Sequence, residues 1–173
     1  IEHGLEKAVT LNQVNAGDSI KLGKHFTAEF IRVNHSIADS CAIAVTCPAG
    51  TIVCTGDFKI DLTPIQGDVI NLTRFGELGK QGVLAMIGES TNAERPGFTM
   101  SERKVGKSLD HIFRGCDKRI VIATFSSNVH RVQQIIDYSY KYGRKVALTG
   151  RSMLNIIAAA QKFGYMDIPE GTL

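Results

Sequence analysis

The sequence predicts an α/β protein built in two parts. In the first half, apolar and polar residues alternate with the period of two that is typical of strands in an antiparallel or mixed sheet. In the second half, β-rich runs alternate with longer helical patterns, which favours a Rossmann-like parallel sheet with crossover helices. A polar, turn-prone stretch at Glu94–Gly97 separates the two patterns, so we expect units at residues 1–92 and 93–173.

Short β-rich runs in the first half are predicted strands. They are Ser19–Leu22, Thr27–Val33, Cys41–Thr46 and Thr51–Thr55. The turn signal Pro48-Ala49-Gly50 predicts that the last two pair as a hairpin. A hairpin places the start of one strand beside the end of the other, so residues 34–35 and 55–57 should meet at one sheet edge. A further run, Gly82–Ile87, predicts a buried strand that delivers Glu89 at its carboxyl end.

The second half predicts helices and strands in alternation. The capping-box sequence Thr99-Met100-Ser101-Glu102 predicts a helix that begins there and runs to about Phe113. A buried strand is expected at Ile120–Phe125 and a second strand at Lys145–Thr149. Each should be followed by a helix, at Ser127–Tyr142 and Ser152–Phe163, that stops before a glycine.

The composition restricts the class of protein. With 43% hydrophobic and 21% charged residues, the chain has the balance of a globular domain. It has no apolar run long enough to span a membrane, and its first residues lack a signal-peptide pattern. A net charge of +3 is too small to indicate nucleic-acid binding by itself. Cys41, Cys47, Cys54 and Cys116 form no Cys-x-x-Cys pair, so we expect buried free thiols and a cytoplasmic location.

One candidate site combines two loops of the predicted hairpin edge. His35 follows a strand and has Ser36, Asp39 and Ser40 nearby, groups that could fix its tautomer. Asp57 follows Gly56 at the end of another strand and would be an oxygen ligand. Taken alone, His35 is more often a solvated loop residue, and Gly56-Asp57 is more often an ordinary turn. Because the hairpin brings them together, we predict that they can share a metal centre.

A second candidate site lies at the expected helix starts of the second half. Ser126, Ser127 and Asn128 precede one helix, with Arg131 one turn inside it, and Arg151 and Ser152 open the next. Backbone donors and hydroxyls at a helix start favour an anion, and ligands of parallel sheets bind at the carboxyl ends of strands. Ordinary helix capping would explain one such loop. Two loops with arginines favour phosphate binding, while the lack of Gly-x-Gly-x-x-Gly argues against a dinucleotide.

Several strings in one order along the chain carry a family resemblance. They are His35-Ser-Ile-Ala-Asp-Ser40, Thr55-Gly-Asp-Phe-Lys59 with Asp61 and Thr63-Pro64, Glu89-Ser-Thr-Asn92, Phe98-Thr-Met-Ser-Glu-Arg103, Ala123–Arg131 and Gly150–Met153. Together they resemble bacterial ribonuclease J, a metallo-β-lactamase-fold nuclease with an inserted β-CASP domain. The resemblance implies that residues 1–92 are part of a metallo-β-lactamase αββα sandwich and residues 93–173 part of a β-CASP domain.

The resemblance also implies roles for individual residues. His35 corresponds to the family's third metal motif and Asp57 to the fourth, a carboxylate that bridges two zinc ions. Glu89 corresponds to the acidic first motif of the β-CASP region, so Asp57 and Glu89 are the expected catalytic carboxylates. Ser126, Ser127, Asn128, Arg131, Arg151 and Ser152 become candidate RNA contacts.

The His-x-His-x-Asp-His segment that supplies most of the family's metal ligands does not occur in this sequence. We therefore expect a middle fragment with an incomplete zinc site, in which His3, His25 and His111 are surface residues. The resemblance implies that the intact protein is a homo-oligomeric, zinc-dependent endonuclease and 5′-to-3′ exonuclease in RNA processing and decay. The alternatives are another β-CASP or metallo-β-lactamase hydrolase, or a nucleic-acid-binding module without catalysis.

Overall fold

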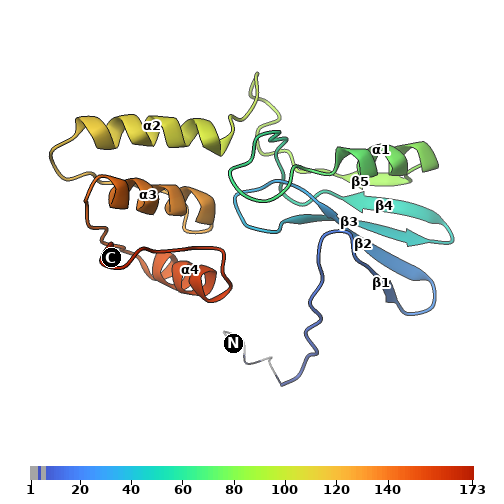
Figure 1. The fold of residues 1–173 in the computed structure, drawn as a ribbon. Helices are drawn as coiled ribbons and strands as arrows, with labels where there is room; N and C mark the ends of the chain where they lie inside the picture. The colour runs from blue at the N-terminus through green and yellow to red at the C-terminus, as the bar shows by residue number, and fades with distance from the viewer. Residues whose placement is uncertain (1–3, 5–6) are drawn as a thin grey trace.

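The computed structural model describes residue 4 and residues 7–173, so His3 lies outside the described residues. The elements are β1 (Ser19–Leu22), β2 (Phe26–Arg32), β3 (Cys41–Cys47), β4 (Gly50–Cys54), α1 (Leu72–Gln81), β5 (Ala85–Ile87), α2 (Glu102–Gly115), α3 (Val129–Lys141) and α4 (Arg151–Lys162). Figure 1 shows the sheet and α1 at one end of the molecule and α2, α3 and α4 at the other. This mixed α/β architecture confirms the predicted fold class.

The five strands form one mixed sheet in the order β1-β2-β3-β4-β5. The first four are antiparallel, and β5 runs parallel to β4. The predicted hairpin is present, with Cys47 paired to Gly50 at its turn. Gly50 has a φ of 135°, and a Cβ there would lie 2.6 Å from the Leu84 side chain, so the turn requires glycine.

Helix α1, which the sequence analysis did not predict, covers one face of this sheet. Asn71 caps it by accepting from the Arg74 N–H, and Leu78 is buried against the strands. Gly76 and Gly79 weaken its helical pattern, because glycine is a poor helix former. The core beneath it consists of Ile31, Val33, Ala42, Ala44, Val53, Ile70 and Leu78.

A separate core in the second half holds α3 and α4 together. It consists of Val129, Val132, Ile136, Ile157, Ala160 and Met166. Helix α2 packs on α3, where Phe113 lies 6.3 Å from the Tyr138 ring. The predicted start of α2 was two residues early, because its cap is Ser101, which accepts from the Arg103 N–H at 3.3 Å.

The two strands predicted in the second half are wrong. Residues 120–125 and 145–149 have no regular secondary structure and join no sheet in the described part of the chain. A strand needs a partner for its backbone groups, and the Val146 N–H instead donates to the Thr172 carbonyl at 2.7 Å. Both segments line a cavity of about 230 Å³ against α3, and Val121 and Phe125 are exposed.

Two further expectations of burial are wrong. Strand β5 is an exposed edge strand: Met86 is 70% and Ile87 60% exposed, and because successive strand residues point to opposite faces, neither face is covered at these positions by the described chain. Of the cysteines, all of which are free, Cys54 is exposed and the other three are partly buried. None of the helices within the described residues combines the length and apolar character that crossing a membrane requires.

Candidate functional site

The β3–β4 hairpin brings His35 and Asp57 together. Its register pairs Ile43 with Cys54, which places the loop before β3 beside the loop after β4. The Nε2 atom of His35 lies 3.8 Å from Oδ2 of Asp57, and both side chains are accessible, at 29% and 73% exposure. The predicted proximity of these two side chains is therefore confirmed.

Buried Asn34 fixes the backbone that carries His35. Its side-chain amide donates to the Asp68 carbonyl at 3.0 Å and accepts from the Ile70 N–H at 2.9 Å. Its own carbonyl accepts from the Lys59 N–H at 2.8 Å, in an isolated antiparallel bridge. This bridge joins the segment of His35 directly to the segment of Asp57.

The expected neighbours of His35 are only partly in place. Ser36 Oγ lies 3.4 Å from its Nε2 atom. Asp39, however, has a φ of 55° and directs its carboxylate to Arg32, at 3.6 Å, and to the Tyr165 hydroxyl. Ser40 donates to the Ile37 carbonyl at 2.9 Å. Asp39 and Ser40 therefore do not orient the imidazole, because closer partners engage them.

Glu89 lies at the same edge of the sheet. Cys54 pairs with Ile87 in the parallel β4–β5 ladder, so the residues that follow both strands are neighbours. The Glu89 N–H donates to Thr55 Oγ1 at 3.3 Å, and its Oε2 accepts from the Thr91 N–H at 2.7 Å. The hydrogen bonds from Thr91, and to a lesser extent the charge of His35, hold the pKa of the Glu89 carboxyl below its usual value.

The residues at this edge fit part of a zinc site. An imidazole nitrogen and a carboxylate oxygen are ordinary zinc ligands, but a stable site uses three or four protein ligands. Within the residues that the structure describes, no group of three or more His, Cys, Asp or Glu side chains is arranged to hold a metal ion. His35 and Asp57 could therefore supply two zinc ligands, and a stable site would need one or two more.

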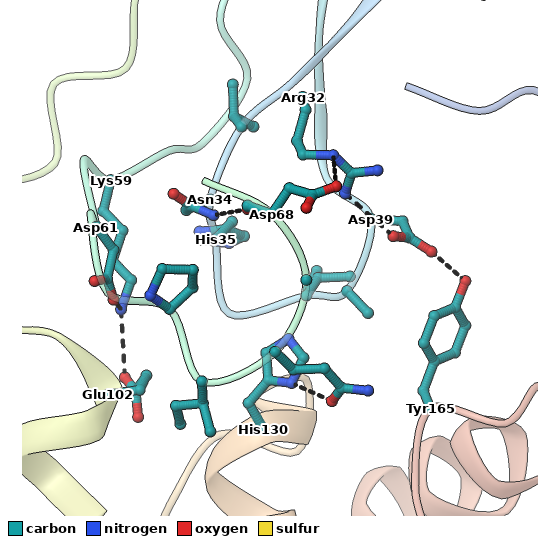
Figure 2. Close-up of a pocket in the computed structure, with 17 residues that line it drawn as sticks. Arg32, Asn34, His35, Asp39, Lys59, Asp61, Asp68, Glu102, His130 and Tyr165 are labelled. Carbon is teal, nitrogen blue, oxygen red and sulfur yellow. Dashed lines mark hydrogen bonds and ion pairs between the residues drawn. The ribbon is translucent and has the colours of Figure 1, made fainter. Parts of the chain in front are cut away.

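A cavity of about 290 Å³ adjoins this edge and lies between the two halves (Figure 2). Lys59 and His35 line it from the sheet side, and Glu102, His130 and Tyr165 line it from the helical side. Burial is the main reason that the pKa of His130 is lowered, and His130 Nδ1 lies 3.1 Å from Gln66 Oε1. Sequence reasoning missed the roles of Lys59, Glu102, His130 and Tyr165 here, because distant segments create the cavity.

Two of the six residues of the second candidate site, Asn128 and Arg131, are engaged in internal contacts. Asn128 is buried and caps α3 by accepting from the Arg131 N–H at 3.2 Å. The Arg131 guanidinium donates twice to Glu102, at 2.6 and 3.1 Å. Capping by Asn128 is the alternative that the sequence offered, whereas the sequence did not reveal the pairing of Arg131 with Glu102.

The other candidate phosphate contacts are more accessible. Ser126 and Ser127 are half-buried, while Arg151 and Ser152 are exposed at the start of α4. Gly150 caps α4 without a side-chain hydrogen bond. Thr124 and Thr149, which precede these loops, both line the cavity of about 230 Å³ described above. The starts of α3 and α4 therefore lie near the same cavity. The exposed His25 and His111 are surface residues, as predicted.

Comparisons with known proteins indicate the class of protein to which the second half of the chain is similar. Residues 117–173 match the family model described as "Ribonuclease J, beta-CASP domain". A crystal structure from Enterococcus faecalis V583, described as that of a protein of unknown function, has a similar fold. It aligns with a TM-score of 0.59 over 93% of this chain and 38% of its own, at 20% identity. Residues 117–173 therefore resemble part of a β-CASP domain.

Curated relatives extend the similarity to nearly the whole chain. A ribonuclease J from Synechocystis is 46% identical over 98% of this chain, and one from Thermus thermophilus is 43% identical over 98%. A ribonuclease J 1 from Streptococcus pyogenes is 42% identical over 99%. Nearly the whole chain is therefore similar in sequence to ribonuclease J, and it spans 26%, 30% and 30% of the length of these relatives.

Proposed function

We propose that this chain is part of a zinc-dependent ribonuclease that hydrolyses phosphodiester bonds of RNA. The observation that carries the proposal is the 3.8 Å approach of His35 to Asp57 at the sheet edge. The ribonuclease J name of the relatives supports RNA as the substrate. We further propose that the intact protein cleaves both internally and from the 5′ end, as a cytoplasmic homo-oligomer.

His35, Asp57 and Glu89 each have a proposed role at this edge of the sheet. His35 Nε2 and Asp57 Oδ2 would hold metal, together with ligands from outside this chain's described residues. Zinc bound there would polarise the scissile phosphate of the RNA and lower the pKa of a water molecule bound to the metal. The hydrogen bonds from Thr91 favour the ionised form of Glu89. Its carboxylate adds negative charge beside His35 and would attract a metal cation to this edge of the sheet. We propose residues 1–92 as the metallo-β-lactamase portion and 93–173 as the β-CASP portion, since each half has its own core.

The starts of α3 and α4 are the proposed RNA contacts. Exposed Arg151 can donate two parallel hydrogen bonds to one phosphate, with Ser152 beside it. Ser126 and Ser127 can add hydroxyl donors at the start of α3. Arg131 and Asn128 support this loop from within, because Glu102 and the helix backbone occupy their polar atoms.

The test uses the full-length protein on RNA that carries a 5′-monophosphate or a 5′-triphosphate, with and without a chelator. We expect chelator-sensitive cleavage that His35→Ala and Asp57→Ala each abolish, while the exposed His25→Ala retains wild-type rates. RNA binding without metal-dependent turnover would instead identify a non-catalytic binding module. Turnover of a substrate other than RNA would identify a different metallo-β-lactamase-type hydrolase.

A further inference from the structure

Glu102 is a carboxylate shared by cations from both halves of the molecule. Its Oε1 atom lies 2.6 Å from Arg131 Nη2 and 3.7 Å from Lys59 Nζ. The side chains of Glu102, Lys59 and Arg131 are only 13%, 18% and 32% exposed. Figure 2 shows Lys59 reaching across the cavity edge to Glu102.

The start of α2, where Glu102 lies, is seated on the segment that follows Asp57. Ser101 Oγ donates to the Thr63 carbonyl at 2.9 Å, and Arg103 donates to the Pro64 carbonyl at 3.4 Å. These contacts place the Glu102 carboxylate over Lys59 and hold it there. The ion pair is therefore built into the junction between the halves.

Both the backbone and the side chain of Lys59 have partners that hold them in place. Its backbone N–H donates to the Asn34 carbonyl beside His35, and its ammonium lies between Asp61, at 3.5 Å, and Glu102. Because Lys59 is only two residues from Asp57, its position sets how far the Asp57 loop can move from His35. At the other end of the network, Arg131 lies one turn inside α3, after the loop of Ser126 and Ser127.

We propose that Glu102 is a positioning residue: by holding Lys59 and Arg131 together, it fixes the Asp57 loop opposite His35 and links it to the start of α3. The inference rests on the proposed function and adds a residue to it. Compared with apolar side chains of similar size, a partly buried ion pair adds little net stability, because desolvation offsets the attraction of the charges, although removing one partner alone is destabilising. The gain from this network is a fixed geometry, and outer groups that orient metal ligands commonly change metal affinity.

The chain offers a matched control. Arg74 donates to Glu29 in the same two-pronged manner, at 2.6 and 2.9 Å, and these side chains are 28% and 22% exposed. That pair joins α1 to β2 and touches neither Lys59 nor Asp57. Glu29→Gln and Glu102→Gln therefore each remove one comparable carboxylate charge, but only Glu102→Gln disturbs the Asp57 loop.

Both variants are made in the full-length protein and compared by zinc competition titration, steady-state RNA cleavage and thermal unfolding. We expect Glu102→Gln to weaken zinc binding and lower kcat by about tenfold, with KM changed less than about twofold. Glu29→Gln should lower the melting temperature but leave zinc affinity and kcat at wild-type values. Equal zinc affinity and kcat in Glu102→Gln and wild type would overturn the inference, as would equal losses in the two variants.

Hydrogen exchange separates this inference from the proposed function. The Lys59 amide should exchange faster in Glu102→Gln than in Glu29→Gln, because its segment loses an anchor. If the wild-type protein neither binds zinc nor cleaves RNA, the proposed function fails, and unchanged exchange at Lys59 would overturn the positioning role separately. If Glu102→Gln does not fold, Lys59→Met is tested instead, because it leaves the ion pair between Glu102 and Arg131 intact. It is expected to weaken zinc binding and to speed hydrogen exchange at residue 59 in the same way.

Discussion

His35 Nε2 and Asp57 Oδ2 lie 3.8 Å apart, although a complete β-hairpin separates them in the sequence. The hairpin register and the bridge between Asn34 and Lys59 produce this approach. The pair is accessible to solvent, so a metal ion can reach it without a rearrangement of the core. This edge is therefore the part of the molecule on which metal binding should depend.

The 173-residue chain by itself should bind zinc substoichiometrically. Two ligands hold zinc weakly, since a stable site uses three or four. Elemental analysis after dialysis checks this prediction, with His35→Ala and Asp57→Ala removing the residual zinc. Stoichiometric zinc together with chelator-sensitive RNA cleavage would contradict it and would mean that the chain contains further ligands.

Replacing Arg151 with alanine in the full-length protein should weaken RNA binding to a similar degree for different sequences. The exposed guanidinium at the start of α4 is predicted to contact one phosphate. Losing one such contact lowers the slope of log affinity against log salt by roughly one unit. Lys24→Ala removes one exposed charge from the β1–β2 turn and is the control. An unchanged slope in a folded Arg151→Ala protein would exclude Arg151 from the RNA path.

Glu102 should make stability depend on pH in the acidic range. Burial disfavours its ionisation, but the hydrogen bond and charge of Arg131 and the charge of Lys59 outweigh burial and lower its pKa. A carboxyl whose pKa is lower in the folded state stabilises the fold above its unfolded pKa, and this contribution is lost as the pH falls.

The stability gap between wild type and Glu102→Gln should therefore be largest near neutral pH and shrink below about pH 5. Urea unfolding at a series of pH values measures it. Burial lowers the pKa of His130 in the same cavity and the charge of Glu102 raises it, so both proteins carry His130→Gln in this comparison, and the difference then isolates Glu102. A gap that is constant down to about pH 3 would show that the ionised carboxylate is not the stabilising form.

The two cores should respond separately to cavity mutations. Ile31 is 2% exposed in the first core and Ile136 is 0% exposed in the second. Replacing either with alanine should cost about 2–5 kcal/mol of unfolding free energy. If residues 1–92 and 93–173 are separate domains, Ile136→Ala should speed hydrogen exchange in α3 and α4 and leave β2 and β3 protected. Equal loss of protection in both halves would indicate one cooperative unit.

Local sequence signals were sufficient where neighbours in the chain are also neighbours in space. The turn at residues 48–50 defined the β3–β4 hairpin, and the hairpin alone predicted that His35 approaches Asp57. The resemblance of spaced motifs such as Thr55–Lys59 indicated the ribonuclease J family, which the relatives bear out. Helices α3 and α4 were placed within two residues at each end, because asparagine and glycine mark their boundaries.

Tertiary structure decided the contacts between distant segments. The sequence alone determined the α/β class, the hairpin edge and the residue types available there. It could not determine that Arg131 turns inward to Glu102, that Lys59 joins them, or that residues 120–125 and 145–149 lack strand partners. Helix caps and tight turns depend on a few adjacent residues, whereas ion pairs and sheet ladders depend on which surfaces meet after folding. The physical reason is that a charge or an extended backbone acquires its role only from a partner, and the fold supplies that partner.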